Sequence, residues 1–293
     1  MRVGPLSNGD DISQRVSKIA SRLQAIPNIL AVVLGGSCAR RTALPGSDLD
    51  IGIYYHENHP PDIEKIRTVA RTIAVAGTEP IVSGFYDWGP WVNGGAWIRT
   101  EQGNVDFLFR NVVQVMRTIE EAKQGKYDHD FHQQPTFGFT SIIYLAEVRC
   151  LVPLYDANNL TQMLKKSIET YPPCLKQKIV HNSLWSAEFT LVHAYTFAKR
   201  ADNWNTICSL GKIGFYLLQT LYALNETYYF GDKGALQGAE VFTVKPAHFQ
   251  LHWSIIFDPS GALSLIARVD AAANLWSSVA DLVEDYSPKF KLT

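Results

Sequence analysis

The chain has 293 residues, of which 46% are hydrophobic and 19% are charged, so it can bury a sizeable core and does not have the composition of a disordered segment. Lysine and arginine number 27, aspartate and glutamate number 28, and the formal net charge is -1. A general nucleic-acid binder needs a surplus of cations to neutralise phosphates, so this balance argues against such a partner.

Cysteine usage and the distribution of apolar residues indicate a reducing, aqueous environment. The four cysteines do not have the CxxC spacing of a zinc knuckle or a redox motif. The N-terminal ten residues lack the apolar core of a signal peptide, and no run reaches the roughly 20 apolar residues that span a bilayer. We therefore expect reduced thiols in a cytoplasmic protein that has no membrane partner.

Strand and helix patterns alternate in the first part of the chain. Apolar runs and β-forming residues predict strands near residues 29–34, 48–55, 80–86, 95–101 and 104–110. Helical spacing of apolar residues predicts helices near residues 12–25, 62–76 and 111–124. The character of the sequence changes after about residue 125, where helical patterns dominate near residues 140–150, 159–170, 173–200, 205–225 and 267–285.

This order of patterns predicts the α+β class. A mixed β-sheet domain with flanking helices is expected over residues 1–128, and an all-α domain over residues 129–293. Neither part contains an internal repeat.

Two carboxylates at the start of the second predicted strand are the most informative feature. Asp48 and Asp50 lie two residues apart, so both side chains leave the same face of the strand. Carboxylates so placed repel one another unless a cation lies between them. Mg²⁺ binds oxygen ligands, so this pair predicts a magnesium site.

A glycine-rich turn that ends at Ser37 precedes these carboxylates, and ten residues separate Ser37 from Asp48. Gly36 allows a ligand to approach the backbone closely, and the hydroxyl of Ser37 can donate to a phosphate oxygen. Arg40 or Arg41 can add positive charge. We include Ser47, which directly precedes Asp48, in this predicted phosphate-binding set.

The pattern Gly36-Ser37-x10-Asp48-x-Asp50 resembles the signature of the DNA polymerase β-like nucleotidyltransferase superfamily. Within that superfamily the chain looks most similar to the aminoglycoside and lincosamide nucleotidyltransferases and to the minimal nucleotidyltransferases. The motif lies within residues 34–53 and is specific for the superfamily. The order of a sheet domain and a helical domain is also similar, but it is far less specific.

The resemblance implies a third carboxylate on a neighbouring strand and a basic residue on a helix. Asp106, in an otherwise apolar predicted strand, is our candidate third metal ligand or general base; a solvent-facing aspartate is the alternative. Glu101 and Glu79 are weaker candidates for that role. Lys212, on a predicted helix, is the candidate contact for the triphosphate, against an ordinary surface lysine.

The function that the resemblance implies is nucleotidyl transfer that depends on two Mg²⁺ ions. AMP would pass from ATP, or another nucleoside monophosphate from its triphosphate, to a hydroxyl of a small-molecule acceptor, and pyrophosphate would be released. An aminoglycoside-like or lincosamide-like antibiotic is a candidate acceptor, which would make the protein an antibiotic-resistance enzyme. The alternatives are nucleotidylation of a protein partner, as antitoxins of this kind perform, and nucleotide-dependent regulation without catalysis.

Two further groups of residues have weaker interpretations. An aromatic segment over residues 86–91, together with Trp97, could stack a nucleobase, cover a sugar or simply pack in a loop. The histidine pairs at residues 56 and 59 and at residues 129 and 132 lie in predicted loops without further clustered ligands, so zinc is not expected there.

Overall fold

The computed structural model describes residues 8–291 and divides into two compact units. One unit comprises the described part of Met1–Glu120 together with Tyr144–Thr170, and the other comprises Glu121–Ile143 and the described part of Tyr171–Thr293. The chain therefore returns to its first unit after leaving it, whereas a single boundary between residues 128 and 129 was expected. The α+β class is confirmed, because the first unit contains a mixed sheet and the second is predominantly helical.

The elements closely follow the predicted patterns in the first 120 residues. The helices are α1 (Asn8–Leu23), α2 (Gly36–Arg40), α3 (Ile63–Ile73), α4 (Val112–Lys123), α5 (Ile142–Cys150), α6 (Leu160–Ser167), α7 (Pro173–Lys199), α8 (Asn203–Leu224), α9 (Ala235–Glu240), α10 (Phe249–Ile256) and α11 (Leu265–Ala280). The strands are β1 (Ile29–Leu34), β2 (Leu49–Tyr55), β3 (Ile81–Val82), β4 (Gly95–Thr100), β5 (Gly103–Asn111), β6 (His129–Asp130), β7 (Phe139–Thr140) and β8 (Val152–Asp156).

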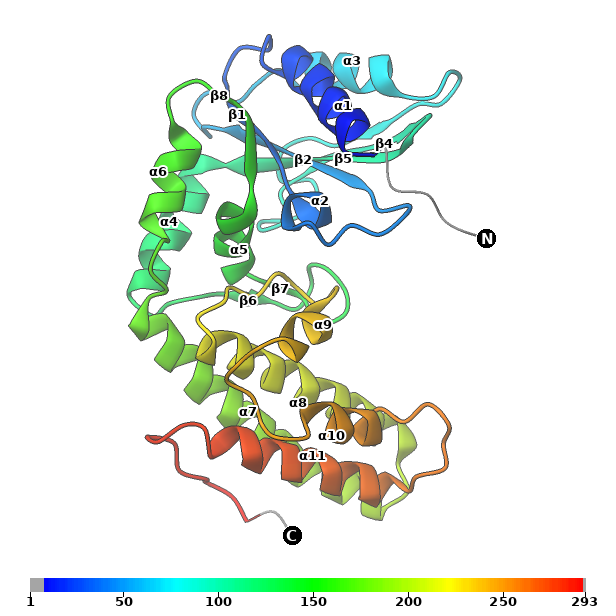
Figure 1. Cartoon of the computed structure of the whole chain (residues 1–293), viewed down its shortest axis with the longest axis vertical. Helices are drawn as coiled ribbons and strands as arrows, with labels where there is room; N and C mark the ends of the chain where they lie inside the picture. Colours follow the sequence, from blue (N-terminus) through cyan, green and yellow to red (C-terminus); the bar gives the residue numbers. More distant parts are fainter. Residues whose placement is uncertain (1–7, 292–293) are drawn as a thin grey trace. The chain divides into compact units, whose positions relative to one another are not determined.

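The main sheet has the strand order β3-β4-β5-β2-β1-β8 (Figure 1). Strands β2 and β5 pair in parallel, and the other neighbours pair antiparallel. The parallel pair arises because the chain crosses from β2 through α3, β3 and β4 before it enters β5. Strands β2 and β5 are therefore central, and both begin at the same end of the sheet.

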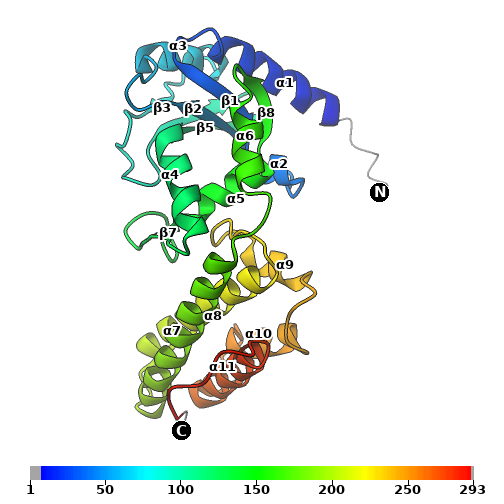
Figure 2. The ribbon, with the colours of Figure 1, turned by 90° about the vertical axis from the view of Figure 1, so that its left-hand side faces the viewer.

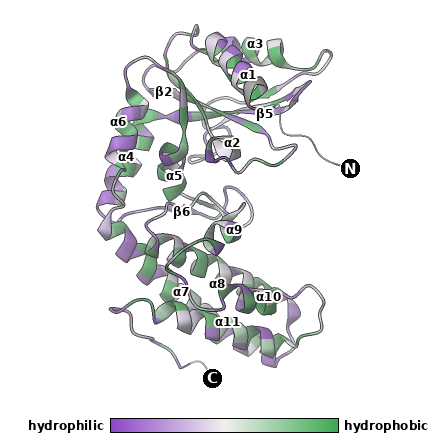
Figure 3. Cartoon of the chain, viewed as in Figure 1, coloured by the Kyte–Doolittle hydropathy of each residue, from purple (hydrophilic) through white to green (hydrophobic). Residues whose placement is uncertain are grey.

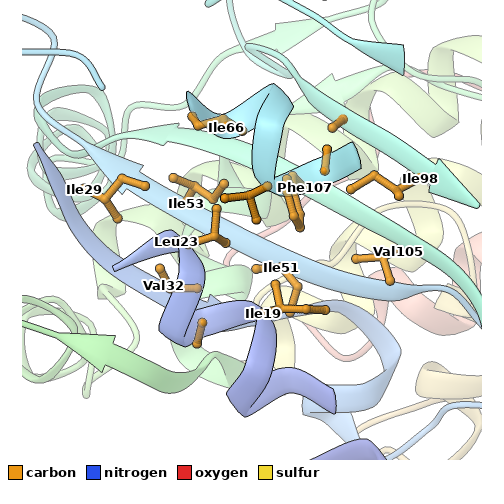
Figure 4. Packing of buried hydrophobic residues seen from close by; sticks show 14 of the residues in the cluster. Ile19, Leu23, Ile29, Val32, Ile51, Ile53, Ile66, Ile98, Val105 and Phe107 are labelled. Atoms are coloured by element: carbon orange, nitrogen blue, oxygen red, sulfur yellow. The ribbon is translucent and has the colours of Figure 1, made fainter. Parts of the chain in front are cut away.

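Helices α1 and α3 cover one face of this sheet and enclose a hydrophobic core (Figures 1 and 4). Every second residue of β2 and β5 points into that core, as period-two alternation requires. Figure 4 shows Ile51 and Ile53 of β2 packed under Leu23 of α1, beside Ile66 of α3. The core-facing residues of the two strands are Leu49, Ile51, Ile53, Val105, Phe107 and Phe109, all at most 3% exposed.

The opposite face of the sheet carries the intervening residues and is covered partly by α2 and α5 (Figure 2). Arg110 of β5 lies on this face, 4% exposed, and forms a two-pronged ion pair with Glu147 of α5, with both N–O distances at 2.7 Å. Burial alone would lower the pKa of Arg110, but the Glu147 carboxylate raises it above its ordinary value. This pair fixes α5 against the sheet.

The strand predictions differ from the structure in three places, one of which is the pair of two-residue strands β6 and β7 in a region that was expected to be all-α. The strand expected over residues 80–86 is limited to β3, because a turn follows in which the amide of Gly84 donates to the Asp87 carboxylate at 2.5 Å. Strand β8 was not predicted. It contains Pro153, which lacks a backbone donor, and it occupies the sheet edge where such a residue is tolerated. Its pairing with β1 returns residues 144–170 to the first unit.

Helices α7 and α8 form the centre of the second unit, with α11 packed on both. Figure 3 shows hydrophobic and hydrophilic positions mixed along these helices. Within residues 8–291, α8 is the one helix long and apolar enough to cross a membrane, and 67% of its most apolar window is buried inside the structure. A core helix of a folded domain has the same properties, and α8 packs as one.

The ion pair between Arg110 and Glu147 can be tested by mutation. Glu147→Ala should lower the free energy of unfolding by about 3–5 kcal/mol, because it leaves the Arg110 guanidinium buried without its partner. Urea denaturation measures the change. Glu79→Gln, which removes the exposed ion pair with Arg71, is the control and should leave the transition in place. Equal shifts for the two variants would contradict the structural role of the buried pair.

Candidate functional site

Two carboxylates meet on the face of the sheet opposite the α1–α3 core. The parallel register of β2 and β5 pairs Asp50 directly with Asp106. Neighbouring strands lie about 4.8 Å apart, and paired residues project to the same face. Both aspartates are half-buried. Asp106 was expected on the strand beside Asp50, and the observed register places it there.

Asp48 lies at the same end of this strand pair, directly before β2. Its Oδ1 accepts a hydrogen bond from Asn104 Nδ2 at 3.1 Å. Asn104 is two residues before Asp106 on β5, so it lies on the same face as that aspartate. Asn104 was not predicted as a site residue, because an asparagine at a strand end carries no signal until the pairing of the strands is known.

The glycine turn after β1 lies directly on Asp50. The amide of Gly35 donates to the Asp50 carbonyl at 2.9 Å, which continues the β1–β2 pairing by one residue. Gly36 has φ +57°, and a Cβ placed on it would lie 1.7 Å from Asp50 Oδ2. A side chain at residue 36 would therefore occupy the position of the carboxylate, so glycine is required here on two grounds.

The predicted phosphate-binding residues surround this turn. Ser37 and Arg40 are half-buried within the short helix α2, and Arg41 is exposed in the left-handed conformation that ends it, with φ 59°. The hydroxyl of Ser47 accepts from the amide of Leu44 at 2.9 Å and closes the loop that leads to Asp48. The positions of these residues agree with phosphate binding beside the carboxylates, which stays a prediction.

Cys38 of α2 packs under the same loop, and its thiol points toward the carbonyl of Asp48, at 3.9 Å. Burial raises the pKa of Cys38, and the Asp50 carboxylate raises it further, while Arg15 opposes both. A raised pKa favours the protonated thiol at neutral pH.

An exposed tryptophan, Trp97 on β4, lies next to Asp106 on the neighbouring strand. In the β4–β5 register Trp97 is the partner of Asp106, so Trp97, Asp106 and Asp50 lie side by side on three adjacent strands. Trp97 is 52% exposed, and its ring stacks on Trp88 with the ring centroids 4.8 Å apart. An apolar platform thus borders the carboxylates on the side away from the glycine turn.

The three aspartates provide the oxygen ligands that a hard divalent cation prefers. Their side chains do not already form a metal-binding cluster: among residues 8–291, no group of three or more His, Cys, Asp or Glu side chains lies close enough together to hold a metal ion. Asn104 engages Oδ1 of Asp48, so Oδ2 can still serve as a ligand. By donor chemistry and by face, the residues fit a divalent cation bound together with a ligand that supplies further oxygens.

The other candidates lie elsewhere. Glu79 pairs with Arg71 at 2.7 Å, and Glu101 is exposed on the turn between β4 and β5, so neither joins the row of Asp50 and Asp106. Lys212 is exposed on α8 in the second unit, with its ammonium 5.9 Å from the centre of the Tyr216 ring. Its contact with a triphosphate stays a prediction.

Comparison with known proteins finds a nucleotidyltransferase domain in part of the chain. Residues 14–83 match the family model of the nucleotidyltransferase domain, which is about a quarter of the chain. The match includes the glycine turn, Asp48 and Asp50, and it ends before Trp97 and Asp106. Domains of this kind generally use a nucleoside triphosphate and a divalent metal ion. The match therefore supports a transferase of the nucleotidyltransferase type.

Among solved structures, the chain is similar to a nucleotidyltransferase-like protein from Exiguobacterium sibiricum 255-15, with 11% identity and a TM-score of 0.46. The similarity covers 92% of this chain and 74% of that one. At this level it carries no inference about function. No curated protein matches the chain.

The contact between Gly36 and Asp50 predicts a sharp effect of adding one methyl group. Gly36→Ala should displace the Asp50 carboxylate and abolish the increase in melting temperature that Mg²⁺-ATP is expected to produce. Gly46→Ala is the matched control, because Gly46 also has positive φ, +85°, but no atom lies within 4 Å of its added Cβ. A Gly36→Ala variant that keeps the full Mg²⁺-ATP shift would show that Asp50 does not bind the metal-nucleotide complex.

Proposed function

We propose that this protein transfers AMP from ATP to a hydroxyl group of a small-molecule acceptor and releases pyrophosphate. The observation that carries the proposal is the direct pairing of Asp50 with Asp106, beside Asp48 and under the glycine turn. The nucleotidyltransferase match independently includes the turn, Asp48 and Asp50. A cytoplasmic location, where ATP is available, accords with this proposal.

In this proposal the three aspartates have different roles in the reaction. Asp48 and Asp50 would hold two Mg²⁺ ions, with Asp106 as the third ligand, and these ions would supply positive charge for the triphosphate and the leaving group. Asp106 accepts the proton of the acceptor hydroxyl, which lies on its side of the row. The resulting oxygen forms a bond to the α-phosphorus, and the bond from that phosphorus to the bridging oxygen breaks. Pyrophosphate leaves with the electron pair of the broken bond.

The glycine turn supports the phosphate side of the site. Because Gly36 has no side chain, the Asp50 carboxylate can lie directly against the turn, next to the residues proposed to bind phosphate. Ser37 donates a hydrogen bond to a phosphate oxygen, and Arg40 or Arg41 offsets its negative charge. These residues orient the triphosphate so that its α-phosphorus faces Asp106. Positioning and charge neutralisation supply most of the rate enhancement in such reactions.

The tryptophan platform supports the acceptor side of the site. Trp97 directly neighbours Asp106, the residue that receives the acceptor proton, and lies two strands away from Asp50. More than half of the Trp97 side chain is exposed although Trp88 stacks on it, so the platform can receive a second flat surface. A ring-bearing acceptor, such as an aminoglycoside or the sugar of a lincosamide, can rest its apolar face there.

The proposed chemistry is tested with labelled ATP, Mg²⁺ and a panel of aminoglycosides, lincosamides, proteins and RNA. Asp106→Asn should lower turnover by about 10²–10⁴-fold while the melting temperature changes little, because it keeps the shape and removes the proton acceptor. Glu101→Gln removes an exposed carboxylate of the same strand pair and is the control. Turnover of Asp106→Asn within a few-fold of the parent would show that Asp106 serves the sheet and not the reaction.

Replacement of Trp97 separates the acceptor side from the nucleotide side. Trp97→Ala should raise KM for the acceptor identified in the panel by about 5- to 100-fold, the value of one stacked ring, and leave KM for ATP unchanged. Trp204→Ala is the matched control, since Trp204 is 76% exposed on α8. A rise in KM for ATP in place of the acceptor would assign the platform to the nucleobase.

A further inference from the structure

The second unit contains a cavity of about 310 Å³ that the proposed reaction does not use. This volume is at the lower end of the range of small-molecule sites. Aromatic rings from the segment before β7, from α8, from the loop after α8 and from α10 form most of its wall, and one carboxylate faces it. The residues that line it are Phe137, Gly211, Gly214, Phe215, Leu218, Tyr229, Asp232, Leu236, Trp253 and Phe257.

Two glycines of α8 create this space. They lie three residues apart, on one face of the helix. A Cβ on Gly214 would lie 2.9 Å from Phe257 and 3.1 Å from Trp253, so its absence allows these two rings to pack against the helix. A Cβ on Gly211 would lie 3.5 Å from the Phe137 ring, an ordinary van der Waals contact, and Gly211 lines the cavity.

The aromatic walls are ordered by contacts among themselves. The rings of Phe137 and Phe215 stack with their centroids 5.0 Å apart, and those of Trp253 and Phe257 are 4.8 Å apart. Tyr229 meets Phe215 edge-on at 6.1 Å. Aromatic faces carry negative electrostatic potential and attract cations, most strongly where water is excluded.

Asp232 adds a full negative charge to the same cavity. Its Oδ2 accepts from the amides of Thr136 and Phe137, both at 2.8 Å, and its Oδ1 accepts from the Tyr229 hydroxyl at 2.5 Å. These bonds hold the carboxylate in place. In the part of the chain that the structure describes, Asp232 forms no ion pair with lysine or arginine, so its charge is not cancelled.

The titratable groups around Asp232 do not neutralise it either. Burial raises the pKa of Tyr229 above its ordinary value, and the bond to Asp232 raises it further, so the phenol stays a neutral donor. His129 contacts the Phe137 carbonyl at 2.7 Å, and burial lowers the pKa of His129, so the imidazole is uncharged at neutral pH. The cavity thus combines apolar walls with one uncompensated negative charge.

We propose that this cavity binds a small organic cation that carries an aromatic or alkyl group, such as a substituted ammonium. Its positive charge faces Asp232, and its apolar part contacts the rings of Phe215, Trp253 and Phe257. Neutral apolar molecules lack the charge that Asp232 complements, and anions are repelled by it. This site is independent of the nucleotidyl-transfer reaction, because it needs neither metal nor triphosphate.

Isothermal titration of the full chain with benzyltrimethylammonium, without ATP or Mg²⁺, tests the proposal. Neopentylbenzene, which has the same shape and no charge, is the matched ligand. We expect Kd for the cation to be at least tenfold lower than Kd for the neutral compound. Equal affinity for the two compounds, or no binding of the cation, would overturn the proposal.

Two variants locate the binding. Gly211→Leu fills the cavity and should abolish binding, whereas Cys208→Leu adds the same side chain at an exposed position of α8 and should preserve it. Asp232→Asn should remove the preference for the cation. If Asp232→Asn fails to fold because the segment at residues 136–137 loses its acceptor, the Gly211→Leu result decides alone. Binding that survives Gly211→Leu would place the cation elsewhere and overturn the assignment.

Discussion

The parallel pairing of β2 with β5 is the constraint on which the candidate site depends. Parallel strands run in the same direction, so an aspartate near the start of each is brought to the same end of the sheet. The register then pairs Asp50 with Asp106 and leaves Asp48 beside Asn104. The core on the opposite face holds this register, because a slip by one residue would turn Phe107 outward and bury the carboxylate of Asp106 in its place.

The candidate site also requires the backbone of the glycine turn to pack closely against the Asp50 carboxylate. Gly36 leaves its space to the half-buried Asp50 carboxylate, and Asn104 donates a hydrogen bond to Asp48. Further along the same face, the Arg110–Glu147 pair secures α5, a helix that belongs to a segment far from β5 in sequence. The sheet therefore has one apolar face that packs on α1 and α3, and a second face on which the aspartates and the Arg110–Glu147 pair lie.

In the helical unit, two glycines, which have no side chains, and a group of aromatic rings line a cavity. Gly214 of α8 allows the rings of Trp253 and Phe257 to approach the helix, and the carboxylate of Asp232 accepts hydrogen bonds from the segment before β7 and lines the cavity. Both units thus use glycine where backbone must lie close to another group. In the first unit that group is a carboxylate, and in the second it is a pair of aromatic rings.

The sequence by itself determined the α+β class, the elements of the sheet domain up to β5 and the pattern Gly36-Ser37-x10-Asp48-x-Asp50, because local periodicity and residue spacing express them directly. It also singled out Asp106 as a charged residue in an apolar strand. The tertiary structure decided which residues lie beside Asp106 and Asp48: strand register places Trp97 next to Asp106, and Asn104 donates to Asp48. It also decided that β8 forms an edge strand of the sheet although it contains Pro153. Such pairings join residues far apart in the chain, and no local pattern encodes a register that depends on the packing of the whole sheet.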